Sequence, residues 1–189
     1  MASSTSSQNG SRGLPGARGI DHIGITVPDM DQAVRFFVDV LGCEKAMSFG
    51  PIADPTPEGT FMTDALGVHR EAVITEITLL RSGHGSNIEL FSYQSPDQKA
   101  VLAKNSDIGA HHIAFYVDDI NAAADYLRAK GVETRMGPIP IEEGPAAGQA
   151  ILYFNAPWGL QIEAISYPKG MAYEKDAATV LWSPKDPAK

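Results

Sequence analysis

Two stretches of the chain alternate apolar and polar or small residues with the period of a half-buried strand. They are residues 22–27, HIGITV, and residues 112–117, HIAFYV. Successive side chains of a strand point to opposite faces, so each stretch has one apolar face and one face that begins with histidine. Each is followed by an apolar stripe at helical spacing, over residues 31–40 and 121–130. The pattern predicts a strand followed by a helix, twice.

The expected helices have plausible end signals. Asp31 and Asn121 stand where an N-cap residue is expected, because their side chains can accept hydrogen bonds from the first free backbone N–H groups. Gly42 and Gly131 stand just after the helices, where glycine commonly terminates a helix. These signals make the two helices equivalent elements of a repeat.

The segments after the helices predict three further strands per copy. Both copies close on the pattern I-E-x-x-S-Y, at residues 88–93 and 162–167. The unit is therefore β-α-β-β-β, present in tandem, which predicts an α+β fold. Paired, the two units would form a curved mixed sheet, a half-barrel, with helices on its outer face. The expected later strands are residues 46–49, 72–81 and 86–93, then 133–136, 149–155 and 160–167.

The copies differ in length, and the remaining segments are irregular in composition. His22 and Glu89 are 67 positions apart and His112 and Glu163 are 51 apart, so the first copy has a 16-residue excess in which residues 59–66 can form a helix. We expect a short helix near residues 97–104 of the linker. The predicted organisation is a disordered tail (1–18), a first module (19–93), a linker (94–109), a second module (110–167) and a C-terminal arm (168–189).

Composition restricts the partners. The net charge of the 189 residues is −8, which argues against nucleic acids and anionic membranes, since both favour basic surfaces. No apolar run approaches the roughly 20 residues of a membrane span. The single cysteine excludes an intrachain disulfide and fits a cytoplasmic location. A small-molecule substrate remains the expected partner.

The histidine faces of the two copies carry the candidate chemistry. By strand alternation, His22 and Glu89 share the face opposite the apolar one, and His112 and Glu163 repeat this arrangement. A single histidine or glutamate in a strand is usually structural, but a solvated face does not explain a matched pair in both copies. If the four groups converge, their two nitrogens and two carboxylates suit a divalent ion such as Ni, Zn, Co, Mn or Fe. The ion would also make buried glutamates tolerable.

The tandem unit, with DHIGITV and HHIAFYV opening and NIELFSY and LQIEAISY closing, resembles the vicinal oxygen chelate superfamily. That family includes glyoxalase I, methylmalonyl-CoA epimerase, extradiol dioxygenases and bleomycin- or fosfomycin-resistance proteins. The resemblance spans about residues 19–167 and implies His22, Glu89, His112 and Glu163 as metal ligands. It also implies a homodimer, with the metal site either within one chain or between two.

The resemblance further implies abstraction of a proton next to a carbonyl, through an enediolate held by the metal ion. Glu163 is the first candidate for the base, and Glu89 can serve the opposite face, which suits an isomerase or epimerase. The alternative is that both glutamates only hold the metal. A small hydroxyketone, a cyclitol-like compound or an acyl substrate would fit this chemistry.

Three other functions stay open. Glyoxalase I (lactoylglutathione lyase) shares the ligand set, but residues 155–159, NAPWG, depart from its usual turn and no basic set for glutathione is evident. An extradiol-type dioxygenase would consume oxygen, and the carboxylate at Glu89 argues against this class of enzyme. A non-catalytic binding or resistance protein would hold its ligand without chemistry.

Other residues have weaker signals. Those that share the face of the glutamates can line the pocket, and Thr26 and Tyr116 can reach its rim. Trp158 either caps the site or is an apolar turn residue. His69 and His84 fall in loops and need no role. The candidate wall residues are Phe91, Tyr93, Ile165 and Tyr167.

Overall fold

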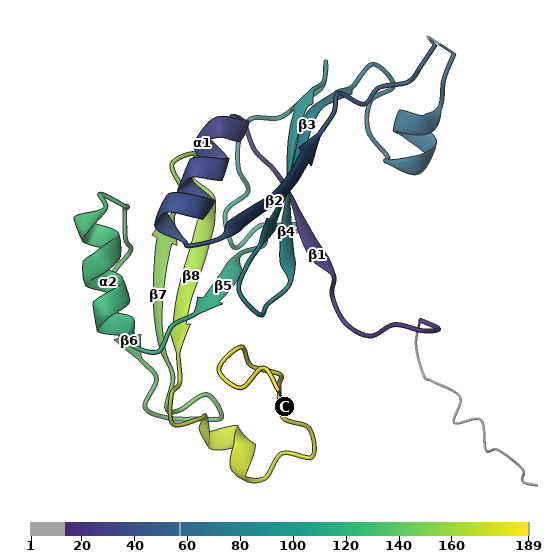
Figure 1. Cartoon of the computed structure of the whole chain (residues 1–189). Helices are drawn as coiled ribbons and strands as arrows, with labels where there is room; N and C mark the ends of the chain where they lie inside the picture. The colour runs from purple at the N-terminus through teal and green to yellow at the C-terminus, as the bar shows by residue number, and fades with distance from the viewer. Residues whose placement is uncertain (1–13, 57, 189) are drawn as a thin grey trace, which may run out of the picture.

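The computed structural model describes residues 14–56 and 58–188 and contains two four-stranded mixed sheets (Figure 1). In each sheet the first and last strands of a module pair in parallel and the other neighbours are antiparallel. The predicted α+β fold with a repeated β-α-β-β-β module is confirmed. In spatial order, the first sheet is β1 (His22–Thr26), β4 (Asn87–Gln94), β3 (Val73–Arg81) and β2 (Glu44–Phe49), and the second is β5 (Ile113–Tyr116), β8 (Gln161–Ser166), β7 (Ala150–Asn155) and β6 (Ile139–Pro140).

The two expected helices are present, but their caps lie two residues earlier than predicted. The helix α1 (Met30–Arg35) continues into a π-helical turn, η1 (Phe36–Val40), and α2 (Ile120–Ala129) is its counterpart. Asp29 accepts a hydrogen bond from the backbone N–H of Gln32, and Asp119 accepts from Asn121 and Ala122. Aspartate at both positions satisfies free N–H groups at the helix start. The prediction of Asp31 and Asn121 as caps was therefore wrong.

Two expected elements take a different form. Residues 133–136 make no regular strand, since only Thr134 bridges Phe154, and the strand β6 begins after Pro138. A bend at Met136 and the φ of +134° at Gly137 interrupt the extended backbone here. Residues 97–104 are irregular, with a turn at Asp97 and a bend at Val101, and do not form the expected linker helix. The insertion of the first module does contain a helical turn, η2 (Phe61–Ala65), and projects away from both sheets (Figure 1).

The segments near the termini are irregular. Residues 14–18 form a turn, and the rest of the tail predicted to be disordered, residues 1–13, lies outside the described residues. The C-terminal arm contains one 3-10 turn, η3 (Ala172–Lys175). In the described part of the chain, no helix has the length and apolar character needed to cross a membrane.

The two modules share one hydrophobic core on their helix-covered sides. The ring of Trp158, in the turn between β7 and β8, lies 5.9 Å from Phe36 and 6.2 Å from Phe37 of the first module. The hydroxyl of Tyr126 on α2 donates to the carbonyl of Val40 at 3.1 Å. Trp158 is thus an apolar turn residue of the core, and does not cap the site. Because the helix-covered sides meet, the opposite faces of the sheets are left to the outside, and the C-terminal arm covers the Tyr167 end of the second one.

Candidate metal centre

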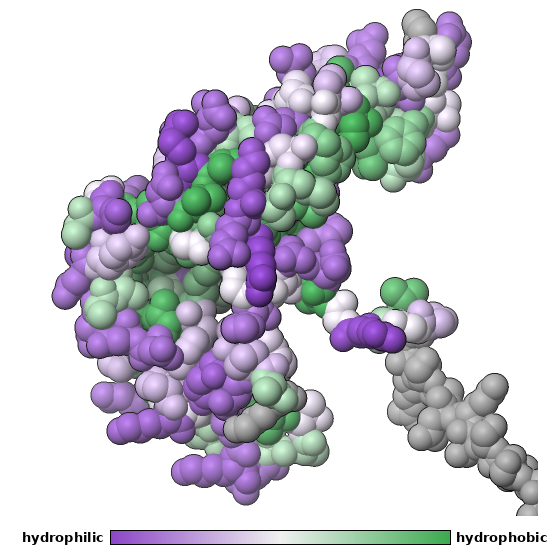
Figure 2. All heavy atoms as spheres, in the orientation of Figure 1, coloured by the Kyte–Doolittle hydropathy of each residue, from purple (hydrophilic) through white to green (hydrophobic). Residues whose placement is uncertain are grey.

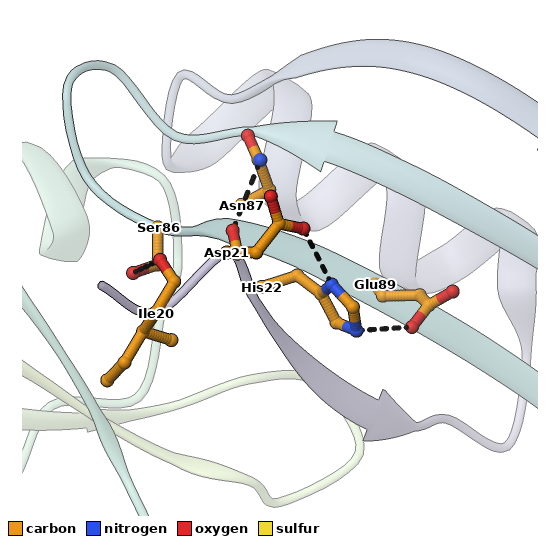
Figure 3. A network of polar contacts seen from close by, with 6 residues as sticks. All are labelled: Ile20, Asp21, His22, Ser86, Asn87 and Glu89. Atoms are coloured by element: carbon orange, nitrogen blue, oxygen red, sulfur yellow. Dashed lines mark hydrogen bonds and ion pairs between the residues drawn. The ribbon is translucent and has the colours of Figure 1, made fainter. Parts of the chain in front are cut away.

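The first histidine–glutamate pair lies on the open face of the first sheet. His22 Nε2 is 3.1 Å from Glu89 Oε2, and His22 Nδ1 is 2.9 Å from Asp21 Oδ1 (Figure 3). The parallel register of β1 and β4 places Glu89 opposite Gly24, two positions after His22. Because glycine has no side chain, the imidazole can lean across this position toward the carboxylate. The imidazole is thereby held between two carboxylates.

Polar contacts fix the start of β1 against β4. The backbone N–H and the side-chain amide of Asn87 both donate to the carbonyl of Asp21, at 3.0 and 3.2 Å. The hydroxyl of Ser86 donates to the carbonyl of Ile20 at 3.1 Å (Figure 3). These bonds hold the residue before His22 in place, so the imidazole is set by the sheet and not by a free loop.

The second pair repeats the geometry of the first. His112 Nε2 is 3.1 Å from Glu163 Oε2, and β5 and β8 are parallel with Ala114 opposite Glu163. Tyr153, which faces Glu163 across β7 and β8, contacts the His112 ring edge-on at 5.5 Å. Burial raises the pKa of the Tyr153 hydroxyl, as do the charge of Glu163 and a hydrogen bond to it. Tyr153 thus lies beside both members of the second pair.

Both pairs combine an accessible imidazole with a protected carboxylate. The side chains of His22 and His112 are 44% and 37% exposed, whereas those of Glu89 and Glu163 are 16% and 8% exposed. The hydrogen bond of the His22 imidazole to the Asp21 carboxylate raises the pKa of His22, and the charge of Glu89 raises it further against the opposing effect of burial. Each pair therefore offers one nitrogen and one oxygen donor atom, and its imidazole is accessible from the surface.

The pairs are not gathered into one cluster. Among residues 14–56 and 58–188, no group of three or more His, Cys, Asp or Glu side chains is placed to hold a metal ion. The structure thus brings His22 to Glu89 and His112 to Glu163, but the four-ligand site stays a prediction. The donor atoms fit a borderline divalent ion, and each pair supplies half of the expected set.

Sequence reasoning missed two contact residues. Asp21 has no equivalent in the second module, where His111 precedes His112, so the repeat did not draw attention to it. Tyr153 shares its face with Glu163 on a neighbouring antiparallel strand, and the register needed to pair them was not evident from the sequence. Strand alternation leaves two possible faces for Tyr153 and does not show which of them carries Glu163.

Residues 21–165 match the family model of the glyoxalase/bleomycin resistance protein/dioxygenase superfamily. The chain belongs to this superfamily. A glyoxalase family protein from Bacillus cereus has the same fold, with a TM-score of 0.62 at 20% identity over 82% of this chain and 98% of that one. A glyoxalase/bleomycin resistance protein/dioxygenase domain from Frankia gives 0.55 at 17% identity over 80% and 98%.

Two named epimerases are similar in sequence to this superfamily member. A 2-epi-5-epi-valiolone epimerase from Actinomyces is 44% identical over 92% of this chain and 93% of its own length. The human mitochondrial methylmalonyl-CoA epimerase is 28% identical over 72% of this chain and 65% of its own length. The similarity to a named epimerase over most of both chains confirms the prediction that this protein is an enzyme.

Proposed function

We propose that the protein is an epimerase of a polyhydroxylated cyclic ketone, with 2-epi-5-epi-valiolone as the candidate substrate. The observation that carries the proposal is the 44% identity with an enzyme of that name over nearly the full length of both chains. The two carboxylates, Glu89 and Glu163, support it, because inversion next to a carbonyl needs a base and an acid. A cytoplasmic location belongs to the same proposal.

His22, Glu89, His112 and Glu163 are the residues that would hold a divalent ion. Imidazole and carboxylate together suit Ni, Zn, Co, Mn or Fe, and the paired atoms already lie 3.1 Å apart. A bound ion would act as a Lewis acid on the ketone oxygen and make the neighbouring C–H more acidic. Asp21, beside the imidazole of His22, and Tyr153, beside the carboxylate of Glu163, would orient these two groups.

The two glutamates have the complementary roles in proton transfer. Glu163 is the first candidate to take the proton from the carbon next to the ketone, and Glu89 returns one to the opposite face. Inversion requires that removal and return occur on different faces, so two separate carboxylates suit it better than one. Their low exposure limits competition from water for the same proton.

We propose further that two copies of the chain complete each site. The shared core places the helix-covered sides of the modules together, so the two pairs lie on faces that do not close on each other within one chain. The strand β2 and the insertion of the first module also expose apolar side chains, and Figure 2 shows hydrophobic surface where the insertion joins the sheet. A second copy would cover this surface and bring its own His112–Glu163 pair to His22–Glu89. The exposed side chains are Met47, Phe49, Phe61 and Leu66.

Solvent exchange tests the proposed reaction directly. The protein, supplied with each candidate divalent ion in turn, is incubated in deuterium oxide with 2-epi-5-epi-valiolone, and the substrate is followed by proton NMR. We expect loss of the signal of the hydrogen next to the ketone, together with appearance of the epimer. Glu163→Gln and Glu89→Gln should each slow inversion by at least about a hundredfold, since general acid–base catalysis contributes roughly that much.

Controls separate this proposal from the alternatives. Glu44→Gln changes an exposed glutamate of β2 and should leave exchange unchanged. Deuterium exchange with methylmalonyl-CoA but not with the cyclitol ketone would indicate an acyl substrate. Formation of lactoylglutathione from methylglyoxal and glutathione would favour a glyoxalase, and oxygen uptake with a catechol would favour a dioxygenase. Tight binding of the ketone without exchange would leave a binding protein.

A further inference from the structure

A polar cavity of about 570 Å³ lies at the far end of the open face of the first module. It is formed by the ends of β1 and β4, by the segment just after η2 in the insertion, and by the start of the linker. The strand residues that line it, Thr26 and Tyr93, share the face of His22 and Glu89. The full lining is Thr26, Gly67, Val68, His69, Tyr93, Ser95, Asp97 and Gln98.

An aromatic surface connects this cavity with Glu89. Phe91 and Tyr93 follow Glu89 on the same face of β4, and their rings are stacked with centroids 5.8 Å apart. The Phe91 ring lies over Gly24, where an added Cβ would come within 3.3 Å of it. Burial raises the pKa of the Tyr93 hydroxyl, and the charge of Glu89 adds to this effect. Phe91 and Tyr93 thus lie between Glu89 and the cavity along β4.

His69 lines the cavity with an imidazole whose Nδ1 is engaged by the backbone. Its Nδ1 accepts a hydrogen bond from the backbone N–H of Glu71 at 3.1 Å. In the neutral imidazole the proton then resides on Nε2, which is left to donate. The half-buried ring is held by the insertion, which has no counterpart in the second module.

The other walls add hydroxyl, carboxylate and amide groups beside the aromatic floor. The hydroxyl of Ser95 donates to Asp97, which leaves the carboxylate with further capacity to accept. A ring with hydroxyls around an apolar C–H face matches such a site, because the face packs on the aromatic rings and the hydroxyls meet polar edges. A flat aromatic or purely aliphatic ligand would leave these polar groups without partners.

The equivalent end of the second module is closed by the chain itself. Tyr167 occupies the place of Tyr93, but its hydroxyl bonds to Ser183 of the C-terminal arm at 2.9 Å. Lys185 of the same arm lies 5.5 Å from the centre of the Tyr167 ring. The arm thus covers this end, and the open polar cavity belongs to the first module.

We infer that this cavity is the subsite for the non-reacting hydroxyls of the polyhydroxylated ring, with His69 as a specificity-determining donor. The inference rests on the proposed epimerase function and adds the place and the residue that recognise the ring. The insertion then has a defined purpose in this chain, since it supplies the donor that the second module lacks.

Binding can be followed at the histidines without reference to turnover. The full chain as purified, with isotopically labelled histidine, is titrated with 2-epi-5-epi-valiolone, with and without added Zn²⁺. We expect the imidazole signals of His69, assigned by their loss in His69→Gln, to shift on addition of the ketone. His84, exposed in the β3–β4 turn, serves as the internal control and should not respond. Shifts at His22 or His112 without a shift at His69 would overturn the subsite.

Kinetics distinguish failure of the subsite from failure of the proposed function. His69→Ala should raise KM for the ketone by about tenfold, the loss of one hydrogen bond, and leave kcat within about twofold. His84→Ala should change neither value. If the wild-type chain neither binds nor exchanges the ketone, the proposed function fails and the subsite with it. If it exchanges the ketone and His69→Ala behaves as His84→Ala does, the subsite alone is wrong.

Discussion

The imidazole of His112 approaches the carboxylate of Glu163 through Nε2 and Oε2 at 3.1 Å, the same atoms and distance that join His22 to Glu89. The same parallel register produces both contacts, with a small residue opposite each glutamate. The surroundings differ, since Asp21 supports the histidine of one pair and Tyr153 the glutamate of the other. The repeat therefore supplies two matched histidine–glutamate pairs, and the residues beside them give the two pairs different properties.

The contact with Asp21 predicts an altered titration of His22. In metal-free protein, NMR should give a His22 midpoint above 6.5, because the bond to Asp21 and the charge of Glu89 favour the imidazolium. The stabilisation from this proton is complete below pH 6.5 and is lost as pH rises through the raised pKa. Asp21→Asn should lower the midpoint, and Asp31→Asn, an exposed change on α1, should not. An equal midpoint in wild type and Asp21→Asn would contradict this account.

The contact with Tyr153 predicts a weaker metal site when its hydroxyl is removed. Tyr153→Phe keeps the ring against His112 but deletes the hydrogen bond to Glu163. Loss of such a supporting contact should weaken affinity for Zn²⁺ by about tenfold, measured by competition with a chelating dye. Tyr126→Phe deletes a hydroxyl at the contact between modules and should leave affinity unchanged. Equal Zn²⁺ affinities of Tyr153→Phe and Tyr126→Phe would show that the Tyr153 hydroxyl does not support the metal site.

The sequence was informative where periodicity and repetition act together. Strand parity placed His22 with Glu89 and His112 with Glu163, because the side-chain period of a strand is fixed and each module has the same order of strands. It failed for the helix caps, since Asp29 and Asp119 compete with equally suitable residues nearby. It could not decide how the modules meet, because that depends on ring contacts such as Phe36 with Trp158, which are far apart in sequence.

The shared core predicts that the modules do not unfold independently. Phe37 is fully buried between them, and Phe37→Ala should lower the free energy of unfolding by about 3–5 kcal/mol in urea, as a large cavity does. Met136→Ala, at a side chain that is 83% exposed, should change it by less than about 0.5 kcal/mol. Both variants should unfold in one transition. A second transition in the wild-type chain would show that the two modules are separate units.

Mixing two inactive variants tests whether each site combines residues of two copies. One chain carries His22→Ala with Glu89→Gln, and the other carries His112→Ala with Glu163→Gln. Alone, neither retains a complete set of ligands. In a mixed dimer with shared sites, the intact first pair of one chain meets the intact second pair of the other, which restores one site. Random exchange of copies should then recover about a quarter of the wild-type exchange rate of the ketone.

The control for this mixing experiment places both double changes in the same chain. That quadruple variant, mixed with either parent, cannot assemble a complete set of ligands and should remain inactive. If activity recovers in the mixture of the two double variants but not in the mixtures with the quadruple variant, Glu89 and Glu163 of different copies must act together. No recovery, despite mixed dimers detected by native mass spectrometry, would contradict a site shared between copies. The catalytic set would then have to assemble within one chain, by a movement of the modules that separates Trp158 from Phe36 and Phe37.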